Sequence, residues 1–370
     1  MEDFMIDGPR PAREEEYDDL MRLLERSYER VREFFQNQYP HIWKKENVQF
    51  ENRFIIKKDG RIVSHVGLTP LNLIVDDKVI KAGGIGGVGT DPDFRGLGFM
   101  SELLKYAIAK MKEHRFPISI LGGDRQRYGS FGWETTGANL ATILSKRNLK
   151  KLNLTKKVEA RKYAQDNADL RKIMEIHESE PLRVQRNEAL YKIMLGKPGQ
   201  EVWLGEGDGD WAYLVIAGGD KEKFVIERGG KPEVFLALAS NILEKIGAES
   251  LRVVQANRFT PLTDVLFKVC GGWSIEPLAM LKIIDLDSTL KSFGTQTEGI
   301  KFQMAGVDED KFGPINFTSA KEIKLPEQAM VRLLFGPMPP SKNFKIEPDL
   351  AKVLDLIFPL NFYLWRMDHV

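Results

Sequence analysis

Residues 84–100 read GIGGVGTDPDFRGLGFM, and this stretch decides the fold of the first part of the chain. Asp76 and Asp77 turn the chain into an expected strand, Lys78–Gly89, in which the stretch begins. It ends at an expected helix, Gly98–Glu113, whose apolar residues recur three and four positions apart. Two glycine patterns, G-x-G-x-x-G and R-x-x-G-x-M, overlap in the stretch and predict different ligands.

The first pattern falls on Gly84, Gly86 and Gly89. A dinucleotide-binding fold needs this pattern to run directly from a strand into a helix, with an acidic residue about 20 positions further on. Here Asp91 and Pro92 follow instead, and no acid ends a strand at the required distance. The pattern therefore does not predict a nicotinamide dinucleotide site.

The second pattern runs from Arg95 through Gly98 to Met100, between a strand and a long helix. Glycines in this position let the backbone curve around an anion, and the free N–H groups of the first helical turn point toward it. The many glycines of the preceding strand indicate close approach of a ligand or another backbone. A peptide-like pantetheine arm could pair with Val88–Thr90 as an additional strand. A glycine-rich turn without a ligand is the alternative.

The flanking segments predict an α+β layer. Pro11 and the acids after it are typical of a first helical turn. Strands are expected at Arg53–Lys57 and Arg61–Val75, joined by an Asp-Gly hairpin, and again at Pro117–Leu121. The resulting order is helix, three antiparallel strands, helix and strand, which predicts a mixed, mostly antiparallel sheet with flanking helices.

The pattern partly repeats further along the chain. Expected strands and helices of this second part are Val202–Leu204, Ala212–Ala217, Lys223–Glu227, helix Pro232–Ile246, strand Ser250–Gln255 and a helix near Thr260–Val269. A third part opens with a strand after Leu278 and ends with helix Pro348–Phe358 and an aromatic tail, Asn361–Val370. We predict domains at 1–148, 149–277 and 278–370, the second being a degenerate copy of the first without its glycine loop.

Composition excludes several classes of protein. A chain of 370 residues exceeds the usual limit of one hydrophobic core. The net charge is +1, from 54 basic and 53 acidic residues, so neither a nucleic-acid nor a membrane partner is expected. Cys270 is the one cysteine and the five histidines are scattered, so no metal site is predicted. The longest apolar stretch, Val234–Leu243, is too short to span a bilayer, and we expect a cytoplasmic location.

The segment VGTDPDFRGLGFMSELL, residues 88–104, resembles motif A of the GNAT acetyltransferases, whose signature is [QR]-x-x-G-x-[GA]. Arg95 and Gly98 match the signature, and Met100 departs from its small last residue. A bulky residue there is familiar in the Eis-like branch, which joins two GNAT-type domains to a sterol-carrier-like C-terminal domain. The resemblance implies this architecture for nearly the whole chain.

The resemblance also implies which residues contact acetyl-CoA. They are Val88, Gly89, Thr90, Arg95, Gly96, Leu97, Gly98, Phe99, Met100, Ser101, Gly123 and Asp124. Asp124 has a plain alternative as a loop acid without a ligand.

Tyr128 is the candidate acid for the departing thiolate. It follows strand Pro117–Leu121 in the run GGDRQRYGSFGWE, and in Eis-like enzymes the Tyr of a similar segment has this role. A phenol can donate a proton to a thiolate. The alternative is a Tyr that only packs against the cofactor.

The base that deprotonates the acceptor amine is harder to assign. His65 lies in a strand, where a structural role is more common, and His114 ends a helix, where a cation is favoured. Eis-like enzymes use their own C-terminal carboxylate, which here belongs to Val370, where the family often has an aromatic residue. Asp368 and His369 are alternatives.

The resemblance therefore implies an N-acetyltransferase that moves an acetyl group from acetyl-CoA to a primary amine. The reaction would be a direct attack through a tetrahedral intermediate. The acceptor would be a small molecule or a lysine side chain, no metal is expected, and assembly into a homo-oligomer is expected. The alternative is a non-catalytic acyl-CoA-binding or interaction protein that has kept the fold.

Overall fold

The computed structural model describes residues 5–152, 157–218, 223–295, 297, 299–306 and 322–370. The chain forms two compact units. The first consists of Met1–Gly137, Ala279–Asn361 and Val370, and the second of Ala138–Leu278 and Phe362–His369. The division into three domains remains a prediction.

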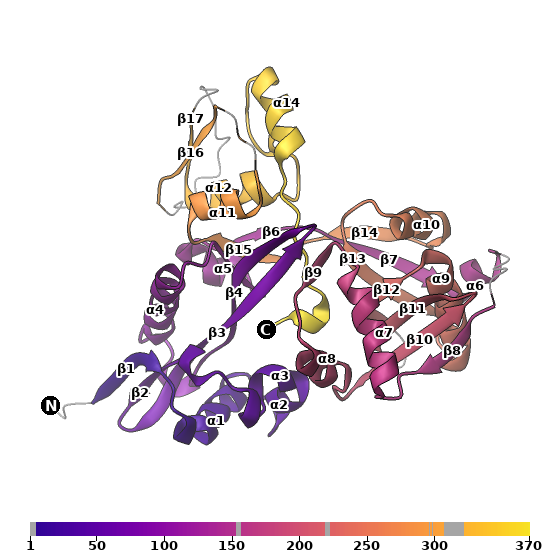
Figure 1. Cartoon of the computed structure of the whole chain (residues 1–370). Coiled ribbons are helices and arrows are strands. Elements are labelled where there is room, and N and C mark those ends of the chain that lie inside the picture. The colour runs from indigo at the N-terminus through magenta and orange to yellow at the C-terminus, as the bar shows by residue number, and fades with distance from the viewer. Residues whose placement is uncertain (1–4, 153–156, 219–222, 296, 298, 307–321) are drawn as a thin grey trace. The chain divides into compact units, whose positions relative to one another are not determined.

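The first unit is built on one mixed sheet (Figure 1). Its strands follow the order β1-β2-β3-β4-β5-β15-β6, and β4 and β5 are parallel while the other neighbours are antiparallel. Their bounds are β1 Ile6–Pro11, β2 Arg53–Lys58, β3 Arg61–Val75, β4 Lys78–Thr90, β5 Ile118–Leu121, β6 Glu134–Thr136 and β15 Ala279–Ile283.

Helices pack on both faces of this sheet. The helices of the first unit are α1 Tyr17–Ser27, α2 Phe34–Gln38, α3 Pro40–Trp43, α4 Phe99–Glu113, α5 Arg125–Tyr128, α11 Leu286–Ser292, α12 Glu327–Phe335, α13 Pro340–Asn343 and α14 Pro348–Ile357. Helix α4 buries Leu103, Leu104 and Met111 in one core cluster with Ile85 of β4. Helix α1 buries Leu20 and other apolar side chains in a second cluster on β2 and β3. Full burial of each such side chain contributes about 1.5–3 kcal/mol.

The predicted strands and helices of the first part are confirmed to within a few residues, and so is the α+β class. The expectation for Pro11 is wrong: this residue ends β1, and α1 starts only at Tyr17, after a turn of 3-10 helix. Proline is tolerated in β1 because this strand lies at the edge of the sheet, where one row of N–H groups needs no ladder partner.

One strand from late in the chain lies inside the first sheet. β15 pairs antiparallel with β5, where Met280 faces Leu121, and with β6, where Ala279 faces Thr136. The sequence predicted this strand but not its neighbours. The rest of this region includes a parallel pair formed by β16 Lys301–Met304 and β17 Glu322–Leu325.

The second unit has its own sheet, in the order β14-β7-β13-β12-β11-β10-β8. The strands of this sheet are β7 Asn139–Ser145, β8 Glu159–Lys162, β10 Gln200–Gly207, β11 Asp210–Ala217, β12 Lys223–Gly230, β13 Ser250–Ala256 and β14 Trp273–Glu276. The second unit also contains a short strand, β9 Leu182–Val184, which does not belong to this sheet. Its helices are α6 Lys146–Lys150, α7 Asn167–Glu178, α8 Glu188–Leu195, α9 Pro232–Lys245 and α10 Pro261–Val269.

The second sheet repeats the central feature of the first. β12 and β13 are parallel and are connected through α9, just as β4 and β5 are connected through α4. The connection from β12 to α9 is the single residue Lys231, whereas eight residues, 91–98, join β4 to α4. The cofactor loop predicted for the first part therefore has no counterpart in the second. Among the described residues, no helix is both long and apolar enough to cross a membrane.

Candidate active site

Strands β4 and β5 separate at the centre of the first sheet. They pair only from Ala82 with Ile118 to Ile85 with Leu121. Beyond this point β4 continues to Thr90, while the chain after β5 turns into α5. Among the described strands, none continues the β5 ladder along residues 86–90 of β4, here called its open segment, and an extended ligand can add to such a segment through main-chain hydrogen bonds.

The open segment of β4 contains a bulge. His65 of β3 pairs with Gly89 and Gly67 pairs with Gly86, so Gly87 falls where the register shifts. Gly87 has a φ of 58°, and a Cβ there would lie 2.7 Å from the ring of Trp43, so only glycine fits. The Nδ1 of His65 donates to the carbonyl of Gly87 at 2.6 Å. The bulge is therefore held by a side chain, which is common beside functional sites.

The predicted cofactor loop joins β4 to α4 through two left-handed glycines. Gly96 and Gly98 have φ values of 79° and 85°, and Gly98 is the N-cap residue of α4. A Cβ built on either glycine would meet nothing within 4 Å. Leu97 between them is 56% exposed. The loop thus presents backbone N–H groups and open space at the start of a 15-residue helix, as an anion site requires.

The predicted ligand residue Arg95 contacts the protein itself. Its guanidinium donates to the carbonyl of Ser27 at 3.0 Å and to the carbonyl of Thr90 at 3.4 Å. Arg95 therefore links the loop to the end of α1. A contact between Arg95 and a ligand remains a prediction.

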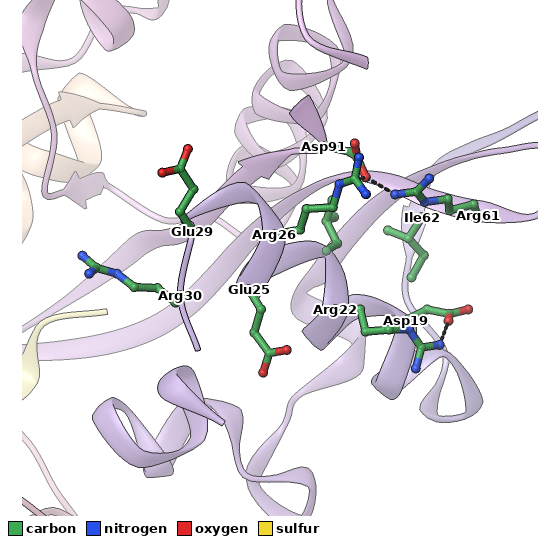
Figure 2. A pocket seen from close by; sticks show the side chains of 10 residues that line it. Asp19, Arg22, Glu25, Arg26, Glu29, Arg30, Arg61, Ile62 and Asp91 are labelled. Carbon is green, nitrogen blue, oxygen red and sulfur yellow. Dashed lines mark hydrogen bonds and ion pairs between the residues drawn. The ribbon is translucent and has the colours of Figure 1, made fainter. Parts of the chain in front are cut away.

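A mixed-charge surface pocket of about 710 Å³ lies over α1 and shares one residue with the start of the loop (Figure 2). That residue is Asp91, which is 1% exposed and forms ion pairs with Arg26, at 3.2 Å, and with Arg61. Its carboxylate also accepts from the N–H of Asp93 at 3.1 Å. Loss of both arginines would leave a buried, unpaired carboxylate, which costs about 3–5 kcal/mol. These ion pairs therefore hold Asp91, the first residue of the loop, in place.

Gly123, Asp124 and Tyr128 lie together after β5. Asp124 accepts from the N–H of Arg127 at 2.9 Å and thereby caps α5, so its observed role is structural. A Cβ on Gly123 would lie 2.4 Å from Cε2 of Tyr128, so the phenol ring lies directly on this glycine. Burial raises the pKa of Tyr128 above its ordinary value of 10. The phenol is therefore protonated at neutral pH and able to donate.

The chain terminus lies on β4, at the point where β4 leaves β5. A Cβ on Gly86 would be 2.6 Å from the carboxyl carbon of Val370, and a Cβ on Gly84 would be 2.8 Å from its Cγ2. Val370 packs against the core cluster that contains Trp43 and the buried face of α1. The terminal carboxylate therefore lies on the sheet face opposite α4, beside the open segment of β4.

The alternative base Asp368 is engaged elsewhere. In the second unit, both of its carboxylate oxygens accept from Arg186, each at 2.7 Å, and Arg186 also binds Glu227 at 2.5 Å. All three side chains are at most 2% exposed. His369 is exposed. Burial raises the pKa of Asp368 to about 6, but both of its oxygens already accept hydrogen bonds from Arg186 in the second unit, and this engagement favours the terminal carboxylate as the base.

The two other candidate histidines have structural positions. His65 is fully buried, and burial lowers its pKa to about 3, so the ring is neutral at pH 7. Its Nδ1 must carry the proton, since the carbonyl of Gly87 can only accept. His114 caps the C-terminal end of α4, as the sequence indicated.

Sequence reasoning missed Tyr28 as a site residue. Its hydroxyl donates to the carbonyl of Val88 at 2.9 Å, on the open segment of β4. Burial, together with the neighbouring Tyr128, raises the pKa of Tyr28 to about 12. In the sequence, Tyr28 is only the last of the apolar residues that recur at helical spacing from Tyr17, and no motif marks it; in the structure it is the C-cap residue of α1. The bulge formed by Gly86 and Gly87 was also not foreseen, although the glycine run signalled close approach.

Comparisons with known proteins agree with this geometry. Residues 8–136 match the family model of the acetyltransferase (GNAT) domain. A GCN5-related N-acetyltransferase from Kribbella flavida is similar over 98% of this chain and 99% of its own, with a TM-score of 0.71 and 14% identity.

Two further solved structures are similar over almost their full length. A probable N-acyltransferase from Enterococcus faecalis V583 has a TM-score of 0.71 at 16% identity and covers 96% of both chains. Eis1 from Mycobacterium abscessus has a TM-score of 0.70 at 11% identity, over 99% of this chain and 100% of its own. At these identities the likeness establishes the fold. No curated protein sequence matches this chain.

Proposed function

Because residues 8–136 match the family model of the GNAT acetyltransferase domain, we propose that this chain transfers an acetyl group from acetyl-CoA to a primary amine. Acyl transfer in general is supported by the family match. The observation that carries the finer proposal is the convergence of three features on β4: its open segment, the glycine loop after it, and the terminal carboxylate of Val370.

Acetyl-CoA is proposed to bind along this edge. Its pantetheine arm would pair with Val88–Thr90, and its pyrophosphate would accept from the N–H groups between Arg95 and Ser101. A Cβ built on Gly96 or Gly98 would meet nothing within 4 Å, which supports room for an anion at this loop. Gly122 also has nothing within 4 Å of a built Cβ, which supports room for the ligand after β5.

Tyr128 is proposed as the acid of the reaction. The amine nitrogen attacks the thioester carbonyl and forms a tetrahedral intermediate with a negative charge on oxygen. When this intermediate collapses, the C=O bond re-forms, the C–S bond breaks and sulfur leaves with the electron pair. The phenol of Tyr128 would give its proton to that sulfur. Its burial beside Gly123 and its raised pKa support a proton that is retained until the thiolate forms.

Val370 is proposed as the base through its terminal carboxylate. An amine is protonated at neutral pH and attacks only after losing a proton. A terminal carboxylate has an ordinary pKa of about 3.5 and is therefore ionised at pH 7. The position of this group on Gly86, next to the open segment of β4, supports direct transfer or transfer through one water molecule.

The proposal is tested by an amine panel. Purified protein is incubated with acetyl-CoA and with polyamines, aminoglycoside-like amines or lysine peptides, and released thiol is measured with a colorimetric reagent. We expect thiol release that depends on the amine. Mass spectrometry should show a product that is about 42 mass units heavier than the amine, because acetyl replaces one hydrogen. CoA binding without thiol release for any amine would favour the non-catalytic acyl-CoA-binding alternative. Assembly into a homo-oligomer remains a prediction.

A further inference from the structure

The segment around Tyr128 is short and buried, and we call residues 125–134 the acid loop. Tyr128 ends α5, and a tight turn, Gly129–Phe131, follows it before β6 begins. The carbonyl of Gly129 accepts from the N–H of Gly132 at 2.8 Å, which closes this turn. Tyr128 and Gly129 are both buried, so the polar backbone groups of the acid loop depend on partners inside the protein.

One of these partners is the side chain of Gln328, in the first turn of α12. Its Nε2 donates to the carbonyl of Gly129 at 2.8 Å, and this hydrogen bond is buried. Gln328 itself is 3% exposed. The carbonyl of Gly129 therefore has two donors, one from its own turn and one from α12. Because water does not compete for a buried hydrogen bond, this contact fixes the backbone directly after Tyr128.

A buried carboxylate connects α12 to both ends of the acid loop. Glu134 is 4% exposed and is the last residue of the loop. It accepts from Arg332 of α12 at 2.6 Å and from Nε of Arg125, the first residue of the loop, at 3.1 Å. Charge-assisted hydrogen bonds of this kind are stronger than neutral ones. The ends of the loop are thus joined to each other and to α12.

The middle of the acid loop also lies directly on α12. Gly132 has a φ of 91°, and a Cβ built there would collide with the carboxylate of Glu327. Glu327 in turn forms an ion pair with Lys282 of β15. Three residues of α12, at positions 327, 328 and 332, therefore contact or approach the segment that carries Tyr128.

The chemical nature of Gln328 is informative because of its surroundings. The structure describes the whole of α12, and every other buried residue of this helix is apolar. An amide at a buried position costs free energy unless its polar atoms are hydrogen-bonded. Packing alone would be served equally well by an apolar side chain of the same length. The amide of Gln328 is therefore explained by the carbonyl that it binds.

We propose that Gln328 is a positioning residue for Tyr128. By holding the carbonyl of Gly129, it keeps the phenol against Gly123 and beside the ring of Trp133, whose centre is 6.5 Å away. The proposal rests on the proposed function, in which Tyr128 gives its proton to the departing thiolate. A reacting group that is displaced by about 1 Å can lose roughly a hundredfold in rate, so a fixed backbone next to the acid matters.

Hydrogen exchange tests whether Gln328 holds the acid loop. Gln328→Met keeps the length of the side chain but removes the donor, and exchange is followed by mass spectrometry on peptides that cover residues 125–134. Amides of this segment should exchange about threefold to tenfold faster than in the parent, because one buried hydrogen bond is lost. The matched control is Gln303→Met, the same exchange on β16, which should leave the acid loop unchanged.

A second variant keeps the proposal testable if Gln328→Met fails to fold, which near-ultraviolet circular dichroism shows. Gln328→Asn retains the amide but is one methylene shorter, so its nitrogen no longer reaches the carbonyl of Gly129. It should accelerate exchange in the same segment. Parental exchange rates of the acid loop in either folded variant would overturn the proposal.

Activity provides the readout that a merely structural role would not give. Gln328→Met should lower kcat about tenfold, with the KM for acetyl-CoA within a factor of about three, because the phenol keeps its proton but loses its exact position. In a Tyr128→Phe protein, the same change should cause almost no further loss. An equal further loss there would contradict positioning through Tyr128. If the parent acetylates no amine, the proposed function fails, while the exchange result still decides whether Gln328 holds the acid loop.

Discussion

The glycine at position 86 offers a way to move the terminal carboxylate without altering the tail. In Gly86→Ala, the new methyl carbon would lie 2.6 Å from the carboxyl carbon of Val370. Carbon atoms in contact prefer separations of about 3.5–4.0 Å, so the carboxyl group would have to shift by about 1 Å. A misplacement of that size costs roughly a hundredfold in rate, or about 2.7 kcal/mol of barrier, when the group takes part in the reaction.

The assay is steady-state kinetics with the best amine from the panel. We expect kcat of Gly86→Ala to fall by about a hundredfold, with the KM for acetyl-CoA within a factor of about three, because the methyl group meets the terminus and not the loop. Gly84→Ala is an informative neighbour. Its methyl would lie 2.8 Å from the Cγ2 of Val370 and 3.2 Å from the carbonyl oxygen of Thr69, but would not meet the carboxyl group, so the loss of kcat should be smaller.

A matched control comes from the second unit. A Cβ on Gly272 would meet nothing within 4 Å, so Gly272→Ala should leave kcat, KM and the melting temperature unchanged. Unchanged kcat in a folded Gly86→Ala protein would refute the assignment of the terminal carboxylate as base. A rise in KM alone would show that the methyl group disturbs substrate binding instead.

Four further expectations follow from the site. Two glycines added after Val370 move the carboxylate by several ångströms, at about 3.3–3.6 Å per residue. Turnover should therefore drop sharply while the melting temperature stays constant. Full activity of the extended protein would show that the terminal carboxylate is not the base. Tyr128→Phe should lower kcat about a hundredfold with unchanged calorimetric CoA affinity, whereas weaker binding at normal turnover would indicate packing alone. Gly98→Glu should abolish CoA binding, while Gly60→Glu, which imposes the same left-handed strain in an exposed hairpin, should not. Burial lowers the pKa of His65 to about 3 in the folded protein, against about 6.5 in the unfolded chain. Because only the unfolded state takes up a proton between these values, the free energy of unfolding should fall as the pH falls from about 6.5 toward 3. Denaturant titrations test this, and a His65→Gln variant with the same pH slope as the parent would contradict it.

The conformation of the predicted cofactor loop could be foreseen from the sequence, because it depends on interactions between neighbouring residues. Positive φ values at Gly96 and Gly98 and the first turn of α4 depend on residues that are adjacent in the chain. The spacing of Tyr128 after β5 is local in the same sense. The role of Arg95 was less predictable, because its partner carbonyl on Ser27 belongs to a distant helix.

What the sequence by itself determined was the set of elements, the glycine loop and the kind of chemistry that the loop permits, since periodicity, turn residues and capping act over a few positions. What only the tertiary structure decided was which distant residues meet. The insertion of β15 beside β5 and the placement of Val370 on Gly86 depend on pairing and packing between segments far apart in the chain. No local pattern encodes such contacts. The hydrogen bond from Gln328 to Gly129 joins residues 199 positions apart, and it exists only because α12 packs beside β6 and β15, whose register is set by pairing across the sheet.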